Sequence, residues 1–95
     1  MPIFFKVLDV VVYSKPDCIF CDKAKALLQV KGIAYTEQII NVDITVPELF
    51  EKLGQEVKTV PQIVVDNTLI GGYTELTEYI AEKENDGSER DIINT

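Results

Sequence analysis

The sequence predicts an α/β fold in which a four-stranded mixed sheet, in the order β-α-β-α-β-β-α, is flanked by helices on both faces. Three observations predict it. Apolar, β-branched runs alternate with segments of helical periodicity, Gly, Pro, Asn and Asp separate these segments, and a chain of 95 residues suits one hydrophobic core. We therefore expect one domain over residues 1–84, followed by an acidic, flexible tail over residues 85–95.

Composition narrows the functions that this domain can have. Hydrophobic residues make up 46% and charged residues 26%, and no segment reaches the roughly 20 apolar residues that a membrane helix needs. The formal net charge is −7, with five lysines against three acids in residues 1–31 but four bases against thirteen acids in residues 32–95. We expect a soluble monomer with no membrane and no nucleic-acid partner.

The first predicted strand is Val7–Tyr13, a β-branched run that is apolar except for Asp9 and is typical of a central strand buried on both faces. Residues 1–13 are apolar enough to resemble a secretory signal, but Lys6 and Asp9 interrupt them and no small-residue cleavage site follows. We expect a cytoplasmic location, where cysteine pairs are usually catalytic, redox-sensing or metal-binding.

A helix is predicted from about Cys18 to Lys31, and Gly32 stands where a helix end favours positive φ. Ile33–Ile40 then reads as a second strand, so the unit is βαβ with parallel strands and a right-handed crossover. The inner face of the helix is predicted from helical spacing to be Phe20, Ala24, Leu27, Leu28 and Lys31.

The second half of the chain supplies a short helix, a hairpin and a last helix. Thr45 to Glu48 fits a capping box with a proline in the first turn, and Gly54 ends the helix whose inner face is Leu49, Phe50 and Leu53.

The hairpin pairs Gln62–Val65 with Thr68–Ile70 around the turn Asp66-Asn67. The last helix runs from about Thr74 to Glu84 and is expected to bury Leu76, Tyr79, Ile80 and the stem of Lys83.

The two cysteines of the chain form Cys18-Ile19-Phe20-Cys21, where a buried strand ends and a helix begins. The N–H groups of the first turn and the helix dipole favour negative charge, and nearby lysines add to this, so the Cys18 thiol should ionise more readily than a free thiol. Cys21 lies nearly one turn further on the same face, where it can resolve a mixed disulfide on Cys18. The lysines concerned are Lys15, Lys23 and Lys25.

Three other interpretations of the cysteine pair stay open. A structural disulfide closing so short a loop would add only about 2 kcal/mol of stability. A zinc site needs four ligands, whereas the chain offers two cysteines and no histidine, so no metal is expected. The cysteines can also be two inert, buried residues.

Two further motifs each have a structural and a functional interpretation. Lys58-Thr59-Val60-Pro61 is either a plain proline at a strand start or a cis Val60–Pro61 bond, which would turn the Val60 backbone toward an extended peptide. The run 71–75, Gly-Gly-Tyr-Thr-Glu, is either a tight turn or a loop whose N–H groups, with the Thr74 hydroxyl, hold a carboxylate.

Together, the motifs YSKPDCIFC (13–21), TVPQ (59–62) and GGYTEL (71–76) resemble those of glutaredoxins of the thioredoxin superfamily, over roughly residues 7–84. The resemblance implies a thioredoxin-like fold and a dithiol oxidoreductase that reduces protein disulfides and glutathione mixed disulfides, with glutathione as electron donor. It assigns catalysis to Cys18 and Cys21, and glutathione binding to the positions Lys15, Thr59, Val60, Pro61, Gly72, Tyr73 and Thr74.

Some roles at this site have alternatives. Lys58 is either a second cation for glutathione or a solvated surface lysine, and Phe20 either packs beside the thiolate or belongs to the helix core. Many dithiol members carry Pro-Tyr where this chain has Ile19-Phe20, so the reduction potential and the substrate preference do not carry over.

Other functions also stay open. The chain can be a redoxin that is fed by thioredoxin reductase and donates electrons to ribonucleotide reductase. It can be a carrier in which two chains bridge a [2Fe–2S] cluster with Cys18 of each and two glutathione thiols. A purely structural interaction module would require all three motifs to be accidental.

Overall fold

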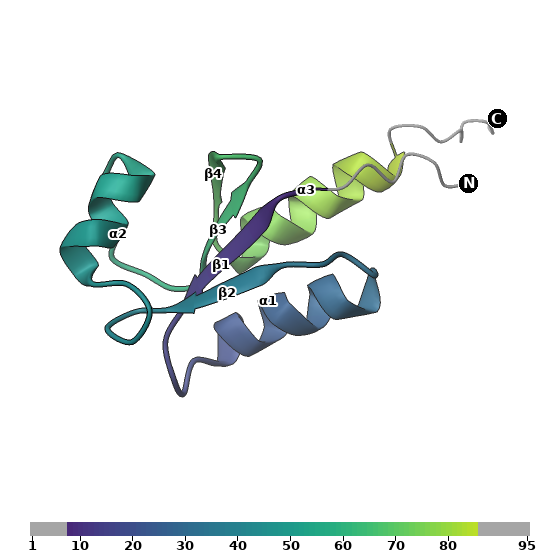
Figure 1. Cartoon of the computed structure of the whole chain (residues 1–95). Helices are drawn as coiled ribbons and strands as arrows, with labels where there is room; N and C mark the ends of the chain where they lie inside the picture. Colours follow the sequence, from purple (N-terminus) through teal and green to yellow (C-terminus); the bar gives the residue numbers. More distant parts are fainter. Residues whose placement is uncertain (1–7, 86–95) are drawn as a thin grey trace, which may run out of the picture.

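The computed structural model describes residues 8–85 (Figure 1). The predicted order of elements is confirmed, and the observed bounds differ from the predicted ones by a few residues at most. The predictions for residues 1–7 and for the tail over residues 86–95 lie outside the described part. The elements are β1 (Val10–Ser14), α1 (Ile19–Val30), β2 (Thr36–Ile39), α2 (Val46–Leu53), β3 (Gln62–Val65), β4 (Thr68–Gly71) and α3 (Tyr73–Asn85).

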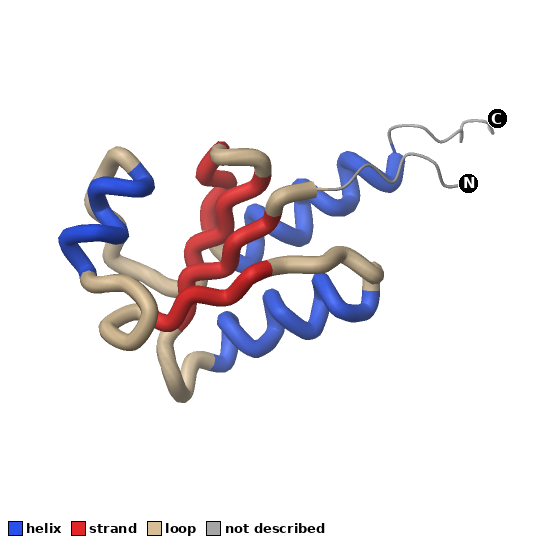
Figure 2. Tube along the Cα trace, in the orientation of Figure 1, coloured by secondary structure: helices blue, strands red, loops and turns tan. Residues whose placement is uncertain are grey.

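The four strands form one mixed sheet in the order β2-β1-β3-β4, which can be followed in Figure 2. β1 pairs in parallel with β2 and antiparallel with β3, so Val12 lies between Glu37 and Ile63. β3 and β4 form the predicted antiparallel hairpin. The parallel β1–α1–β2 unit and the central position of β1 are therefore confirmed.

Helices cover both faces of the sheet, as predicted (Figure 1). α1 and α3 lie on one face, and α2 lies on the other. The core under α1 and α3 consists of the buried residues Val10, Val12, Ala24, Leu28, Ile63, Val65, Leu76 and Ile80. The core on the α2 face consists of Tyr13, Ile44 and Leu49.

The residues at the start and end of α2 and in the hairpin turn form the hydrogen bonds and adopt the positive φ angles that their residue types predict. Thr45 Oγ1 accepts from the Glu48 N–H at 3.3 Å and the Glu48 carboxylate accepts from the Thr45 N–H at 2.8 Å, which is the predicted capping box. Gly54 ends α2 with φ 76°, and Asp66 and Asn67 turn the hairpin with φ 50° and 67°.

Three predicted inward positions are wrong. Phe20 is 54% exposed, because Cys21, Ala24 and Leu28 take the inner face of α1 and Phe20 falls on its flank. Lys31 is exposed, and its ammonium lies 2.7 Å from the Glu84 carboxylate at the end of α3.

Lys83 is also exposed, since its ammonium lies 5.4 Å from the centroid of the Tyr79 ring instead of against the core.

The second strand is shorter than predicted, because the Ile33 N–H is still bonded to the carbonyl of Leu28 at 2.9 Å and completes the end of α1. Among residues 8–85, no helix has the length and apolar character needed to cross a membrane.

Candidate functional site

A disulfide between Cys18 and Cys21 lies where β1 ends and α1 begins, with the two Cα atoms 5.2 Å apart. Cys18 is the N-cap residue of α1 and has extended backbone dihedrals, whereas Cys21 lies within the first turn. Cys18 is 9% exposed and Cys21 is 1% exposed. The structure therefore shows the dithiol pair in its oxidised form, with the first cysteine closer to solvent.

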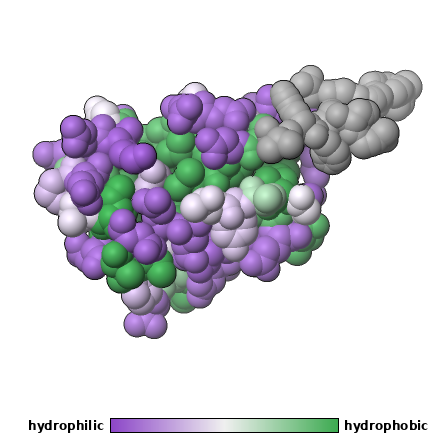
Figure 3. Space-filling model, in the orientation of Figure 1, coloured by the Kyte–Doolittle hydropathy of each residue, from purple (hydrophilic) through white to green (hydrophobic). Residues whose placement is uncertain are grey.

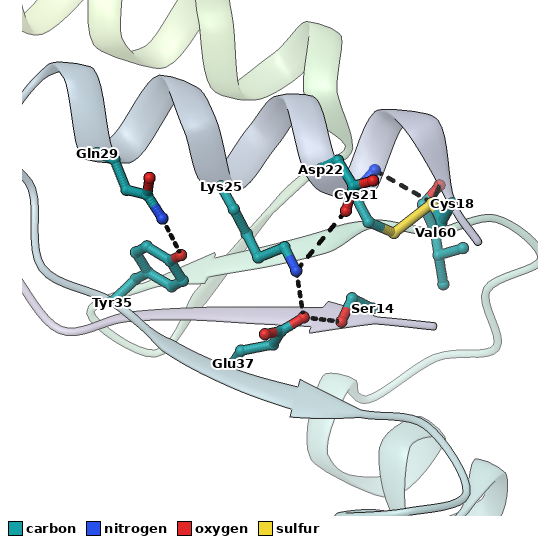
Figure 4. A network of polar contacts seen from close by, with 9 residues as sticks. All are labelled: Ser14, Cys18, Cys21, Asp22, Lys25, Gln29, Tyr35, Glu37 and Val60. Atoms are coloured by element: carbon teal, nitrogen blue, oxygen red, sulfur yellow. Dashed lines mark hydrogen bonds and ion pairs between the residues drawn. A yellow bond between two sulfur atoms is a disulfide. The ribbon is translucent and has the colours of Figure 1, made fainter. Parts of the chain in front are cut away.

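Two backbone groups surround the Cys18 sulfur (Figure 4). The N–H of Cys21 donates to Cys18 Sγ at 3.1 Å, and the carbonyl oxygen of Val60 lies 3.9 Å from the same sulfur. The Val60–Pro61 bond is cis, which settles the question that the sequence left open. The second motif thus lies directly beside the first.

The third motif completes this cluster. Gly72 packs so closely on the second motif that a Cβ atom added to it would lie 3.4 Å from the carbonyl oxygen of Pro61. The Tyr73 ring lies 6.0 Å from the ring of Phe20, between centroids. All three sequence motifs therefore meet at one end of the sheet, around the disulfide.

Gln62 holds the second motif in place. Its side-chain amide donates to the carbonyl oxygen of Thr59 at 2.9 Å and to the Thr59 hydroxyl at 3.2 Å, and the residue is only 6% exposed. This role of the Gln62 side chain was not predicted from the sequence. The available signal was a long polar side chain in a strand that is otherwise apolar.

The backbone N–H of Gly72, before the start of α3, is not open to a carboxylate from outside the chain. The N–H of Gly72 donates to Glu75 Oε1 at 2.8 Å, so a carboxylate of this chain already occupies that donor. Gly71 has φ 120°, and a Cβ atom there would lie 2.8 Å from Glu75 Cγ, so the turn requires glycine. Thr74 is exposed on the first turn. Sequence reasoning missed Glu75, although its spacing from Gly72 is that of a capping box.

The lysines near the disulfide have different electrostatic settings. Lys25 is held by two carboxylates, with its ammonium 2.8 Å from Glu37 and 3.8 Å from Asp22 (Figure 4). The hydrogen bond to Glu37 raises the pKa of Lys25, and the same bond, with one from the Ser14 hydroxyl at 2.6 Å, lowers the pKa of Glu37. The charge of Lys25 is thus compensated and adds little to the potential around Cys18.

Lys15, Lys23 and Lys58, in contrast, have no ion pair within 4.0 Å in the described part of the chain. The ammonium of Lys23 lies 5.4 Å from the centre of the Phe20 ring. Lys15 and Lys58 lie beside α2, at the rim of a hollow of about 210 Å³. Four predicted site residues line this hollow, namely Lys15, Lys58, Thr59 and Val60, together with Ile40, Val46, Leu49, Phe50 and Val57.

For residues 8–85, no three His, Cys, Asp or Glu side chains are grouped so that they could hold a metal ion. The reactive side chains at this site are those of the cysteine pair. Its surroundings are a backbone edge at Val60, two glycines, two aromatic rings and uncompensated lysines.

Comparisons with known proteins agree with this arrangement. The sequence model of the glutaredoxin family matches residues 10–70. Glutaredoxin 1 of Rickettsia conorii is 44% identical over 64 residues, which are 66% of this chain and 63% of that protein. Glutaredoxin 1 of Escherichia coli K12 is 33% identical over 81 residues, which are 79% of this chain and 95% of that protein.

Other relatives are longer than the matched region. The hybrid peroxiredoxin hyPrx5 of Haemophilus influenzae is 39% identical over 70 residues, and the match covers 74% of this chain but 28% of that protein. Hence the chain spans less than two thirds of the length of some curated relatives, including the one from Rickettsia conorii.

Among solved structures, buckwheat glutaredoxin in complex with glutathione is similar, with a TM-score of 0.65 and 26% identity over 81% of this chain and 72% of that chain. Reduced Escherichia coli glutaredoxin gives a TM-score of 0.68 with 33% identity, over 83% of this chain and 99% of that chain. The fold is therefore that of a known family, and the family model spans the first two motifs.

Proposed function

Since the chain belongs to the glutaredoxin family, we propose that it is a glutathione-dependent thiol–disulfide oxidoreductase that reduces protein disulfides and glutathione mixed disulfides. One observation carries the proposal. Cys18 caps the N-terminus of α1, where the Cys21 N–H points at its sulfur, and it lies beside the Val60 carbonyl in a cluster of three motifs.

The setting of Cys18 suits a nucleophile. Once the disulfide is reduced, the Cys21 N–H and the positive end of the helix dipole favour the thiolate over the thiol. The uncompensated lysines Lys15 and Lys23 act in the same direction, whereas Lys25 does not. Cys21 is almost fully buried, so it reacts with a sulfur already bonded to Cys18.

The exchange steps balance without a further cofactor. The Cys18 thiolate attacks the glutathione sulfur of a mixed disulfide, and the substrate thiolate leaves and takes a proton. A second glutathione thiolate then attacks the sulfur bonded to Cys18, which yields glutathione disulfide and free Cys18. For a protein disulfide, Cys21 attacks the mixed disulfide on Cys18 instead, and the product is the disulfide seen here. Two glutathione molecules restore the dithiol.

Glutathione as the reductant is supported by the similarity to buckwheat glutaredoxin, which was crystallised with it. Glutathione carries a peptide backbone and two carboxylates. The Val60 backbone suits the first, while Lys15 and Lys58 suit the second. The Gly72 N–H is not available to a glutathione carboxylate while it donates to Glu75. In this proposal, the Thr59, Gly72, Tyr73 and Thr74 positions complete the site, and the Phe20–Tyr73 pair forms one wall.

The test is glutathione-dependent reduction of a small glutathione mixed disulfide, coupled to glutathione reductase and followed by NADPH consumption. Cys18→Ser should lose at least about 10³-fold in kcat/KM, because the attacking thiolate is gone. Cys21→Ser should keep this activity and lose reduction of protein disulfides. Turnover by Cys18→Ser would refute the nucleophile. A wild type that accepts electrons from thioredoxin reductase but not from glutathione would refute the reductant.

A further inference from the structure

We propose that the hollow beside α2 is a side-chain subsite for protein disulfide substrates, and that it accepts an apolar residue next to the reacting cysteine together with an acidic residue beyond it. The inference rests on the proposed function, since it specifies which protein segments that site prefers. It goes beyond glutathione binding because the subsite reads a side chain that glutathione lacks.

The position of the hollow is the first argument. Val60 contributes to its lining and also places its carbonyl oxygen 3.9 Å from Cys18 Sγ. A segment joined to Cys18 and paired with the Val60 backbone advances about 3.3 Å per residue. The one or two residues that flank the reacting cysteine therefore reach the hollow.

The lining is the second argument. Leu49 is only 2% exposed and forms part of the lining, Ile40, Phe50 and Val57 are half-buried, and Val46 is 38% exposed at the edge. Figure 3 shows apolar surface where α2 meets the sheet. An apolar side chain placed here removes further apolar surface from water, which is favourable.

Glutathione accounts for the polar part of this lining but not for its apolar part. The residue that follows its cysteine is glycine, which has no side chain to place against Val46, Phe50 or Val57. An apolar wall next to the reacting sulfur thus distinguishes a peptide segment from glutathione.

The charges at the rim are the third argument. Lys15 and Lys58 are exposed, line the hollow and have no ion-pair partner within 4.0 Å among residues 8–85. The chain as a whole carries a net charge of −7. An acidic segment is therefore repelled by most of the surface and attracted at this rim, where it pairs with the two lysines before glutathione uses them in the later, reductive step.

The reaction on such a substrate is the dithiol exchange. The Cys18 thiolate bonds to one sulfur of the substrate disulfide, and the other sulfur leaves as a thiolate and takes a proton. While the first sulfur is bonded to Cys18, its flanking residues occupy the hollow. Cys21 then attacks Cys18 and releases the second thiol, and glutathione supplies the two electrons for the next cycle.

The test compares two peptides with an intramolecular disulfide. In one, leucine and then glutamate flank each cysteine on its outer side; in the other, glycine and glutamine replace them. The symmetric flanks make the result independent of the direction in which the peptide binds. We expect kcat/KM to be at least about fivefold higher for the peptide with leucine and glutamate, as one well-placed apolar group commonly gives about tenfold.

Two matched valine variants locate the effect. Val46→Asp places a carboxylate at the edge of the hollow, in the first turn of α2 where aspartate is compatible with the helix, and should reduce the preference to less than twofold. Val42→Asp is the control, because Val42 is 72% exposed on the preceding loop and does not line the hollow. Val42→Asp should reduce the small glutathione mixed disulfide at the wild-type rate. For Val46→Asp the readout is the ratio of kcat/KM for the two peptides on the same protein, so any change in the use of glutathione affects both peptides equally.

Equal kcat/KM for the two peptides in the wild type, with normal reduction of the glutathione mixed disulfide, would overturn the subsite and leave the proposed function standing. So would an equal loss of preference in Val42→Asp and Val46→Asp.

A binding measurement separates the subsite from turnover altogether. The peptide with leucine and glutamate, with serine in place of both cysteines, is titrated into the oxidised wild-type protein while amide chemical shifts are followed by NMR. We expect the largest shifts at Val46, Phe50 and Val57. Such shifts in a protein that reduces no disulfide would overturn the proposed function and retain the subsite, whereas their absence at millimolar peptide would overturn the subsite.

Discussion

The two faces of the sheet are packed in different ways. Under α1 and α3, eight buried residues form a continuous core, whereas the α2 face has three buried residues and a hollow beside them. The disulfide lies where the two faces meet, since Cys21 belongs to α1 and Val60 lines the hollow. One face thus holds the reacting sulfur in position, and the other leaves room for what reacts with it.

Polar contacts reinforce the difference. We call the face covered by α1 and α3 the closed face, and the face covered by α2, with its hollow, the open face. On the closed face, Lys25 of α1 bonds to Glu37 of β2, and Glu37 in turn accepts from Ser14 at the end of β1. This network ties the helix that carries Cys21 to two strands (Figure 4). On the open face, Lys15 and Lys58 carry charges that no carboxylate of the described chain pairs with. The lysine on the closed face thus stabilises the fold through an ion pair, whereas the two lysines on the open face remain available to bind a charged ligand.

The largest expected effect comes from a pair of leucine truncations. Leu28 is 1% exposed on the closed face and Leu49 is 2% exposed on the open face. Replacing either by alanine therefore removes the same side-chain atoms from an equally buried position. Leu28→Ala leaves an enclosed cavity and should lower the free energy of unfolding by about 3–5 kcal/mol. Leu49→Ala should cost about 2–3 kcal/mol, because its neighbours and water can enter the space from the adjoining hollow.

Urea denaturation of the oxidised proteins measures both free energies of unfolding on one scale. A cost for Leu49→Ala equal to or above that for Leu28→Ala would show that the α2 face is as tightly packed as the other. The comparison between the faces would then fail.

Much of the fold follows from the sequence. The run ending at Tyr13, the helical spacing of Ala24 and Leu28, and the Asp66-Asn67 turn are local signals, and each one predicts its element. The three motifs also predict where the site lies, because their order along the chain brings them to one end of the sheet.

What the sequence did not predict depends on which neighbour a side chain meets. Phe20 has the spacing of an inward residue, yet Cys21 takes that direction and Phe20 meets Tyr73 instead. The pairing of Lys25 with Glu37 depends on the parallel alignment of β1 and β2, and no sequence pattern encodes it. The hollow is likewise a tertiary feature, because its lining comes from four separate segments.

A smaller effect is expected from the ion pair on the closed face. Glu37→Gln should lower the free energy of unfolding at pH 7 by about 1 kcal/mol, because it weakens a partly buried, charge-assisted contact with Lys25. The folded state lowers the pKa of Glu37, so the stabilisation is present above its unfolded pKa of about 4.3 and is lost as pH falls through the lower folded value.

The stability that Lys25 contributes changes with pH in the opposite direction. The folded state raises its pKa, so this contribution is present below the unfolded pKa of about 10.4 and is lost as pH rises through the folded value. Wild type and Glu37→Gln should therefore differ most between about pH 5 and pH 10 and converge in acid. Denaturation curves recorded from pH 3 to pH 9 test this, and a difference that persists unchanged at pH 3 would contradict it.

The smallest expected effect is that of Thr77→Ala, and it is best measured against a threonine on the other face of the sheet. Thr45 caps α2 and satisfies the Glu48 N–H, so Thr45→Ala should cost about 1 kcal/mol of unfolding free energy. Thr77 lies inside α3, where its hydroxyl donates to the carbonyl of Thr74 at 2.6 Å, a bond that helices do not need. Thr77→Ala should change stability by less than about 0.5 kcal/mol, since alanine is the better helix former.

The contrast between these variants separates packing from local chemistry. If Thr77→Ala costs more than Thr45→Ala, tight packing around α3 outweighs the loss of a cap, and the closed face is even less tolerant than its leucine core indicates. If Thr45→Ala also weakens the preference for the peptide with leucine and glutamate, the start of α2 shapes the hollow through Val46, the residue that follows the cap. Thermal unfolding of both variants, with the peptide assay run alongside, distinguishes these results.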